Sequence, residues 1–236
     1  MRRYFKLKHS IKYNNKIIPG LDGKSVNDKD LLFGTSLVGA NKFFKSKVKF
    51  DYFILTNFGE LESNEAPLII CDYHQWVGEY PIGGQFLPIS ETFRKLLLRF
   101  ELPEHRFYPT KVLFEGTKYK FSILQVLMNT YIEFIDFQNT RFNNLNLYGE
   151  LLFEKKDIKT FNNFEEMEEY YLINWDFNWN YEKIVMKTTF RDIDLIYLPQ
   201  LNEVVSERLK IAIEEAGITG VEFEELPVPI EFNDEV

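Results

Sequence analysis

Residues 204–223 contain the clearest periodic pattern of hydrophobic and polar positions in this chain. Apolar residues recur at helical spacing from Leu209 to Ala216, opposite charged positions. Ser206 stands where a helix N-cap is expected, and Gly217 follows the last periodic residue, where a left-handed C-cap is common. The pattern therefore predicts a capped amphipathic helix, which Gly220 connects to a short strand.

A weaker copy of this pattern lies 116 residues earlier. Ser90-Glu91 matches Ser206-Glu207, and the apolar positions after the two serines match one for one. A Leu-Pro pair precedes each copy, at Leu87-Pro88 and at Leu198-Pro199. Amphipathic helices are common, so a chance likeness is the alternative to a repeat. If the repeat is real, the chain contains two related helix-to-strand units.

Most of the remaining pattern is typical of strands. Glu115-Gly116-Thr117 separates two apolar stretches and predicts a hairpin. Asn162 or Asn163 is placed to cap a short helix that extends to Leu172. The other predicted strands cover residues 50–56, 67–71, 131–142, 145–153, 184–190 and 195–197, and the longest of these is expected to turn Ile132, Phe134 and Phe137 inward.

These elements predict an α+β fold: a strand-rich mixed or antiparallel sheet with about three helices and a possible two-fold pseudo-repeat. We expect one domain over residues 1–236. Its parts would be a strand and loop region at 1–86, a central part at 87–223 with repeat units near 87–114 and 198–223, and an acidic tail at 224–236.

Composition narrows the class of protein. Aromatic residues make up 17% of the 236 residues, which predicts an ordered core rather than a disordered adaptor. A single cysteine, Cys71, excludes an internal disulfide framework and is typical of a reducing compartment. Neither a signal-peptide pattern nor an apolar run of membrane-spanning length is present, so we expect a soluble cytoplasmic protein without membrane contact.

The net charge of −8 is unevenly distributed along the chain. Residues 1–50 carry 12 basic and 3 acidic side chains, whereas residues 201–236 carry 2 basic and 10 acidic ones. We favour the interpretation that the two ends neutralise each other in the fold. The alternative is two surface patches of opposite sign, one of which steers a charged protein partner.

No catalytic, metal or cofactor motif is evident. Cys71 lies near His74 in sequence, but a catalytic thiolate needs a base within hydrogen-bond reach and a metal needs three or four ligands, so a buried structural cysteine is the favoured interpretation. Residues 34–39 have the glycines of a phosphate loop without its lysine and hydroxyl. The acidic overall charge argues against a nucleic-acid partner despite the basic, aromatic N-terminus.

Two acidic stretches are the candidate partner-binding regions. One lies on the predicted helix near residue 165 and the other at the C-terminus; the simplest alternative for each is a solvated surface. The candidate residues are Glu165, Glu166, Glu168 and Glu169 on the helix, and Glu224, Glu225, Glu231, Asp234 and Glu235 in the tail.

The stretch from Val205-Ser206-Glu207-Arg208-Leu209 to Gly217-Ile218-Thr219-Gly220-Val221-Glu222-Phe223 resembles the C-terminal signature of a bacterial family. That family is the eleventh class of polymorphic-toxin immunity proteins, formerly a domain of unknown function. Pro88-Ile89-Ser90-Glu91, and the segment from Tyr119 through Asp136 to Thr140, resemble the middle of the same family. Together the matches extend over residues 87–223.

The resemblance implies an antitoxin rather than an enzyme. Such a protein binds a cognate toxin, encoded beside it and delivered by a contact-dependent system such as type VI secretion, and protects the producing cell during interbacterial competition. Steric occlusion of the toxin is the expected mechanism. The alternative functions are a small hydrolase or nucleic-acid-processing enzyme with a site near Cys71, Asp72 and His74, or a scaffold protein without a toxin.

Overall fold

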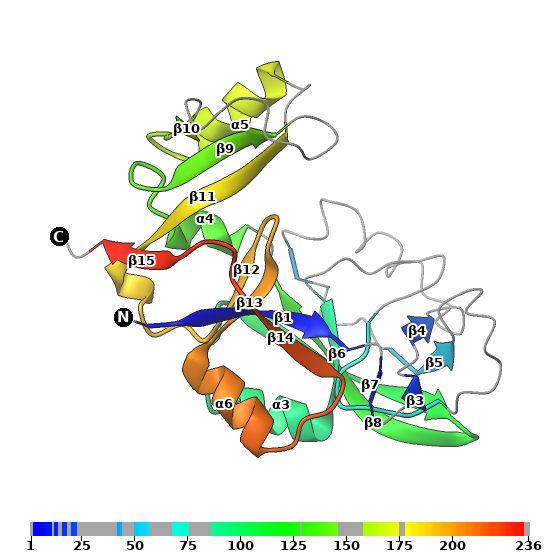
Figure 1. Cartoon of the computed structure of the whole chain (residues 1–236). Helices are drawn as coiled ribbons and strands as arrows, with labels where there is room; N and C mark the ends of the chain where they lie inside the picture. Colours follow the sequence, from blue (N-terminus) through cyan, green and yellow to red (C-terminus); the bar gives the residue numbers. More distant parts are fainter. Residues whose placement is uncertain are drawn as a thin grey trace.

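A computed structural model describes residues 2–10, 12–13, 16–17, 20–22, 42–43, 50–56, 68–75, 86–127, 129–145, 158–174 and 178–233. These residues form a strand-rich α+β fold, which confirms the expected fold class (Figure 1). Its sheets have the strand orders β12-β13-β1-β14, β10-β9-β11-β15 and β4-β5-β7-β8-β6, with a small ribbon, β2-β3. The described part contains four α-helices, one more than the sequence predicted.

The first strand–helix–strand unit consists of β6 (Phe86–Ser90), α3 (Glu91–Leu97) and β7 (His105–Phe114). Strand β8 (Thr117–Val126) pairs antiparallel with both β6 and β7, so it lies between two parallel strands. Glu115 and Gly116 connect β7 to β8 with positive φ angles of 47° and 77°. Such a turn matches the twist of a two-residue hairpin. The predicted hairpin is confirmed.

The second unit repeats this topology with β13 (Asn202–Ser206), α6 (Glu207–Glu215) and β14 (Val221–Glu225). Its middle strand is β1 (Tyr4–His9), which pairs antiparallel with β13 and with β14. Strand β12 (Leu195–Leu198) extends the sheet beyond β13. The N-terminus of the chain therefore supplies the strand that β8 supplies in the first unit.

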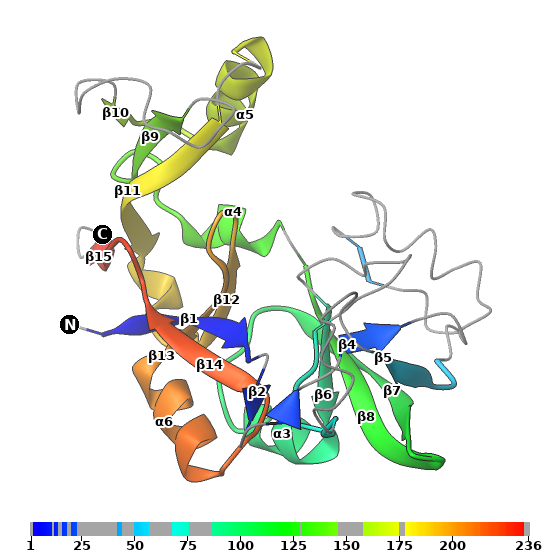
Figure 2. The ribbon, with the colours of Figure 1, turned by 45° about the vertical axis from the view of Figure 1, so that its right-hand side comes forward.

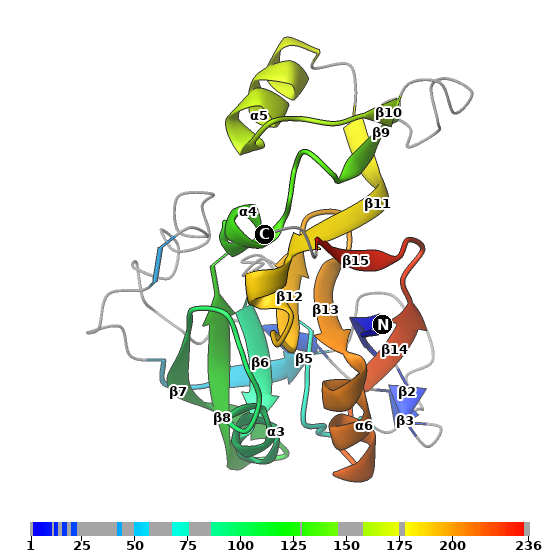
Figure 3. The same ribbon diagram turned by 90° about the vertical axis from the view of Figure 1, so that its left-hand side faces the viewer.

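Helices α3 and α6 contact each other and lie side by side, each with a serine at its N-cap (Figure 3). The hydroxyl oxygens of Ser90 and Ser206 accept hydrogen bonds from the backbone three residues ahead, at 3.1 and 3.2 Å. Each hydroxyl also donates to a buried or half-buried aspartate at 2.5 Å, Asp72 in one unit and Asp194 in the other. The predicted repeat is therefore present in the fold.

Each of the two aspartates also accepts a hydrogen bond from the backbone of the other unit. Asp72, which caps with Ser90 at α3, accepts a hydrogen bond of 3.0 Å from the backbone of Thr219, just after α6. Asp194, which caps with Ser206 at α6, accepts one of 3.0 Å from the backbone of Glu101, just after α3. Each cap therefore ties its own helix to the end of the other, and the two units form one interlocked body.

The two Leu-Pro pairs that precede the copies stand at different distances from their serines, and the structure shows why. In the first unit Tyr73 pairs with Ile89, the residue before Ser90, and in the second Leu195 pairs with Val205, the residue before Ser206. The two units can therefore be aligned with one serine on the other. In that alignment Leu87-Pro88 lies inside β6, whereas Leu198 ends the preceding strand β12. The two pairs therefore occupy different positions of the repeat.

The segment of the chain between β8 and β12 forms an arm. It contains α4 (Thr130–Phe134), β9 (Arg141–Leu145), β10 (Ile158–Lys159), α5 (Phe164–Ile173), β11 (Asn178–Lys187) and the 3-10 turn η1 (Thr188–Phe190). Strand β11 pairs antiparallel with β9 and parallel with β15 (Ile230–Asn233). In two views α5 and β10 lie at the end of the arm, far from α3 and α6 (Figures 1 and 2).

The small N-terminal strands complete the described elements. Strands β4 (Gly20–Asp22) and β5 (Phe53–Thr56) extend the sheet of the first unit beyond β7. Strands β2 (Lys12–Tyr13) and β3 (Lys16–Ile17) pair only with each other among the described residues.

The strand predicted over residues 131–142 is wrong. Helix α4 ends at Phe134, and β9 begins only at Arg141. Tyr131, Phe134 and Ile135 are spaced as on one helical face, whereas Ile132 and Phe134 also fit the alternation of a strand. Tyr131, Phe134 and Ile135 are buried in one hydrophobic cluster, and packing there selects the helix.

Three smaller corrections concern strand ends. Thr188–Phe190 forms a 3-10 turn instead of continuing the predicted strand, and the strand starts earlier, at Asn178. Within residues 68–71 only an isolated bridge at Leu68 replaces the expected strand. The strand expected over 145–153 is described only at Leu145, where β9 ends, and the phosphate-loop-like residues 34–39 lie outside the described residues.

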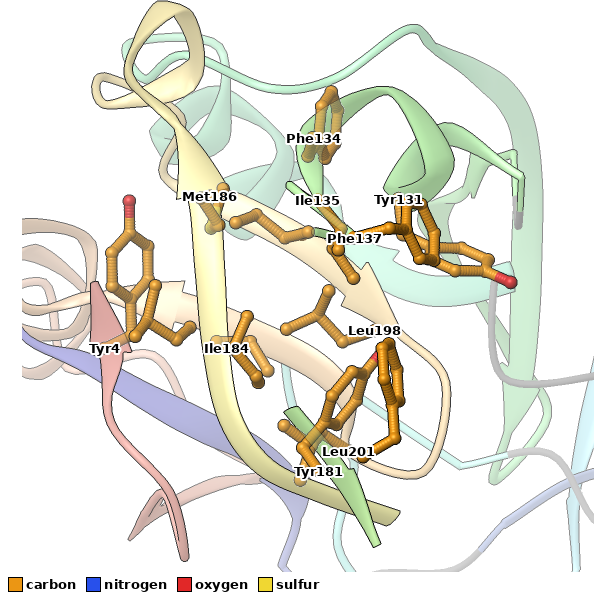
Figure 4. Close-up of a cluster of buried hydrophobic side chains, with 14 of the residues drawn as sticks. Tyr4, Tyr131, Phe134, Ile135, Phe137, Tyr181, Ile184, Met186, Leu198 and Leu201 are labelled. Carbon is orange, nitrogen blue, oxygen red and sulfur yellow. The ribbon is translucent and has the colours of Figure 1, made fainter. Parts of the chain in front are cut away.

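Three hydrophobic clusters form the core of the described chain. One packs the arm against β12 and β13, and Figure 4 shows side chains from α4, β11 and β12 meeting there. A second fills the seam between the two units, with Phe93 and Leu97 of α3 facing Leu209 and Ile213 of α6. The third lies under the sheet of the first unit. Because the first cluster is continuous with the arm, α5 is fixed to the body by packing.

Candidate partner-binding surface

Helix α5, which carries four of the predicted binding residues, starts at a well-formed cap. Asn163 is the N-cap, and its side-chain oxygen accepts a hydrogen bond of 2.9 Å from the Glu166 backbone. The Glu166 carboxylate reaches back to the backbone and side-chain nitrogens of Asn162, at 2.7 and 2.8 Å. The cap predicted at residue 162 or 163 is thus confirmed at Asn163. The Glu166 carboxylate is thus occupied in a bond that resembles a capping box but goes to the residue before the N-cap.

The inner face of α5 is held by aromatic packing and by one polar clamp. Met167 is buried, and Tyr170 and Tyr171 pack edge to face with each other. The Asn144 amide donates to the Tyr170 hydroxyl at 3.1 Å and accepts from the Tyr171 hydroxyl at 2.9 Å. Because both tyrosines are bound to β9 in this way, the rotation of α5 about its axis is fixed.

The outer face of α5 is a continuous exposed stripe. Its members recur at three- and four-residue spacing and are all exposed: Glu165, Glu168, Glu169, Leu172 and Ile173. None of the three glutamates forms an ion pair with another residue of the described ranges. Leu172 and Ile173 are each 71% exposed, more than any other large hydrophobic residue described. Three unneutralised carboxylates therefore lie next to an apolar pair that lacks cover.

The acidic residues near the C-terminus have a different environment. Glu224 forms an ion pair with Lys8, and Glu225 one of 3.0 Å with Arg3, because β14 lies beside β1. Glu231 pairs with Lys183 at 2.6 Å. The hydrogen bond from Lys8 lowers the pKa of Glu224. The favoured interpretation that the two ends of the chain neutralise each other is confirmed for Glu224 and Glu225, whereas the partner of Glu231 lies on β11. Asp234 and Glu235 lie outside the described ranges.

Cys71 and His74 come together, but not as an activated pair. The Cys71 backbone donates to the His74 Nε2 atom at 3.0 Å, which occupies the lone pair that a general base would use. Both side chains are buried, and burial raises the pKa of the Cys71 thiol. A nucleophilic cysteine needs a lowered pKa. The Asp72 carboxylate is bound to Ser90 and to Thr219.

A charged cluster that the sequence analysis missed surrounds Asp194. The fully buried carboxylate accepts bonds from Arg2 at 2.7 Å, from the Arg208 guanidinium at 2.5 and 2.6 Å, and from Ser206. Burial alone would raise the pKa of Asp194, but the bonds from Arg208 and Ser206 bring the pKa below its usual value. With every oxygen bound, the cluster fastens the N-terminus to α6 and offers no reactive group.

Neither a metal site, nor a membrane span, nor a known relative points to a function for the described part of the chain. The described residues contain no group of histidine, cysteine and acidic side chains arranged to hold a metal ion. No helix in the described ranges is long and apolar enough to cross a membrane. No known protein-family model and no curated protein matches the chain. The outer face of α5 is therefore the described surface with the strongest indication of a partner, and the immunity-family resemblance remains a hypothesis from the motifs.

Proposed function

We propose that the chain is an immunity protein that binds and neutralises a toxin effector of an interbacterial competition system. The observation that carries the proposal is the outer face of α5, where exposed carboxylates that form no ion pair with any described residue adjoin Leu172 and Ile173 at 71% exposure. Exposed apolar residues rimmed by polar ones are typical of protein–protein interfaces. The motif resemblance over residues 87–223 supports the same class of protein.

The two halves of the stripe suit two steps of binding. The carboxylates of Glu165, Glu168 and Glu169 would attract a basic surface and raise the association rate, an effect that salt screens. Leu172 and Ile173 would then enter an apolar pocket of the partner and slow dissociation. Because packing and the Asn144 clamp fix α5, little conformational entropy would be lost on docking.

Neutralisation in this scheme is steric. The arm holds α5 away from the paired helices α3 and α6 (Figure 2). In this scheme α5 contacts the toxin, and the rest of the chain blocks access to the toxin surface around that contact. The protein would act in the cytoplasm, against a toxin encoded by the adjoining gene and delivered by a contact-dependent secretion system. No catalysis by this chain is required.

The test is a titration of the purified chain against the product of the adjoining gene, together with growth rescue of cells that express that product. We expect a dissociation constant at or below the nanomolar range and full rescue. Cys71→Ala should bind and rescue as the wild type does, because the thiol has no role in this scheme. Absence of both binding and rescue would overturn the proposal, and loss of rescue in Cys71→Ala alone would favour the enzyme alternative.

A further inference from the structure

Glu203 breaks the two-fold relation between the units in an unusual way. When Ser90 is aligned with Ser206, Glu203 of β13 takes the position that Leu87 takes in β6. Leu87 belongs to the hydrophobic cluster of the seam and is 4% exposed. Glu203 is 9% exposed, so the chain buries a carboxyl group where its own repeat buries a leucine.

The strand register points Glu203 into the seam. Residues two apart on a strand share a face, and Val205 on β13 belongs to the seam cluster. Tyr197 of β12 is the direct cross-strand neighbour of Glu203. The Oε1 atom of Glu203 has no hydrogen-bond partner in the described residues. Burying a polar atom without a partner destabilises a fold, so leucine would be the more stable choice at this position.

The charged and titratable groups around Glu203 come from three segments. Lys6 of β1 interacts with it electrostatically, as do Tyr73, in the segment that bridges to β6, and Tyr197. His9 of β1 packs edge to face on Tyr73, and His74 follows Tyr73 in the chain. The other buried acid that joins the two units, Asp194, is bound by Arg2, Arg208 and Ser206. Among the described residues, Lys6 is the cation that acts on Glu203.

We propose that Glu203 makes the seam between the two units a pH-sensitive latch, closed while the carboxyl group keeps its proton and loosened when it ionises. An ionised carboxylate in the seam would be desolvated and would interact unfavourably with Tyr73. The backbone of Tyr73 links the two units, because it bridges to Ile89 of β6 and donates a hydrogen bond to Thr219, after α6. Ionisation would therefore weaken the contact between the two units first.

The pH window follows from the shifted pKa values of buried Glu203 and half-buried His9. Burial raises the pKa of Glu203 from 4.5 to about 8, so the folded chain keeps a proton that the unfolded chain releases. Stability from this group therefore falls as the pH rises from about 4.5 to about 8. Burial lowers the pKa of His9 from 6.5 to about 4, which makes stability rise with pH between those values. The two effects oppose each other below pH 6.5, and Glu203 acts without that opposition between 6.5 and 8.

Urea unfolding of the full chain at pH 6.5 and pH 8 tests the latch. Over this interval we expect the folding equilibrium constant of the wild type to fall by up to about thirtyfold more than that of Glu203→Gln, at about tenfold per pH unit. Glu203→Leu, which copies Leu87, should behave as Glu203→Gln does and provides a second variant if the amide is poorly tolerated. Glu215→Gln, at an exposed glutamate of α6, is the matched control and should follow the wild type.

Amide hydrogen exchange at pH 8 separates a loosened seam from a uniform loss of stability. Two backbone N–H groups bind across the seam: that of Tyr73 donates to the Thr219 carbonyl at 3.1 Å, and that of Thr219 donates to the Asp72 carboxylate at 3.0 Å. We expect both to exchange faster in the wild type than in Glu203→Gln at the same pH, while β9 and β11 amides differ less. Equal pH dependence of unfolding in the two proteins, or equal exchange of the two seam amides, would overturn the latch.

Discussion

Helix α5 and strand β14 carry similar runs of glutamates, yet the fold gives these glutamates opposite surroundings. On β14, Glu224 and Glu225 lie opposite the basic strand β1 and are consumed in ion pairs with Lys8 and Arg3. On α5, Glu165, Glu168 and Glu169 have no such neighbour in the described chain, and they adjoin two exposed apolar side chains. Acidity in the sequence therefore marks a candidate interface only where the fold leaves it unneutralised.

The comparison also separates a structural contribution from a binding one. The β1–β14 pairing brings the two ends of the chain together, so its charges act within the molecule. The exposed stripe on α5 makes no evident contribution to folding, because its members point away from the aromatic cluster that holds the helix. Substitutions on α5 should change binding with little effect on stability, whereas substitutions on β14 should do the reverse.

The largest effect is expected at the apolar end of α5. Leu172→Asp combined with Ile173→Asp should weaken binding to the product of the adjoining gene by about hundredfold or more, as for residues at the centre of an interface. The melting temperature should stay close to that of the wild type, because both side chains are exposed. Calorimetric titration and thermal unfolding measure the two quantities.

The matched control is Leu98→Asp, at an exposed leucine that ends α3 on the other side of the molecule. It should leave the affinity unchanged. An equal loss of affinity in both variants would mean that the position on α5 does not matter.

A smaller effect is expected at the acidic half of the stripe. Replacing Glu165, Glu168 and Glu169 together by lysine should slow association by about tenfold at low salt and leave the dissociation rate nearly unchanged. The difference from the wild type should shrink as salt is raised, because exposed charges are screened. Stopped-flow or surface binding kinetics at two salt concentrations measure this. Association that is unchanged at low salt would remove the steering role of the carboxylates.

The smallest effect on binding is expected on β14. Glu224→Lys with Glu225→Lys should keep the affinity within about threefold of the wild type, because these groups lie outside the proposed contact. The variant should be slightly less stable, since it replaces the ion pairs with Lys8 and Arg3 by like charges and places one lysine directly opposite Lys6. Chemical unfolding and the same titration measure both. A loss of affinity larger than that of the α5 variants would reverse the comparison.

Local signals in the sequence predicted the elements that depend on local physics. The caps at Ser90, Asn163 and Ser206 are each formed by bonds within three residues, and the hairpin turn needs only Glu115 and Gly116. Helix α4 was missed because a short apolar stretch suits both periods, and distant packing decides between them.

The features that the sequence did not reveal depend on contacts between residues far apart in the chain. Asp194 is held by Arg2 and Arg208, which lie at opposite ends of the chain. The glutamates of β14 are neutralised only because β14 pairs with β1. The acidic residues of α5 were recognised, but Leu172 and Ile173 were not, although their spacing from Glu165 and Glu169 places them on the same helical face. That spacing was the signal available.

The most direct test of the account is hydrogen exchange of the chain, free and in complex with the product of the adjoining gene. The account predicts slower exchange on binding at the backbone amides of residues 168–173, in the last turns of α5, and unchanged exchange along β14. Slower exchange along β14, with α5 unchanged in the complex, would contradict it.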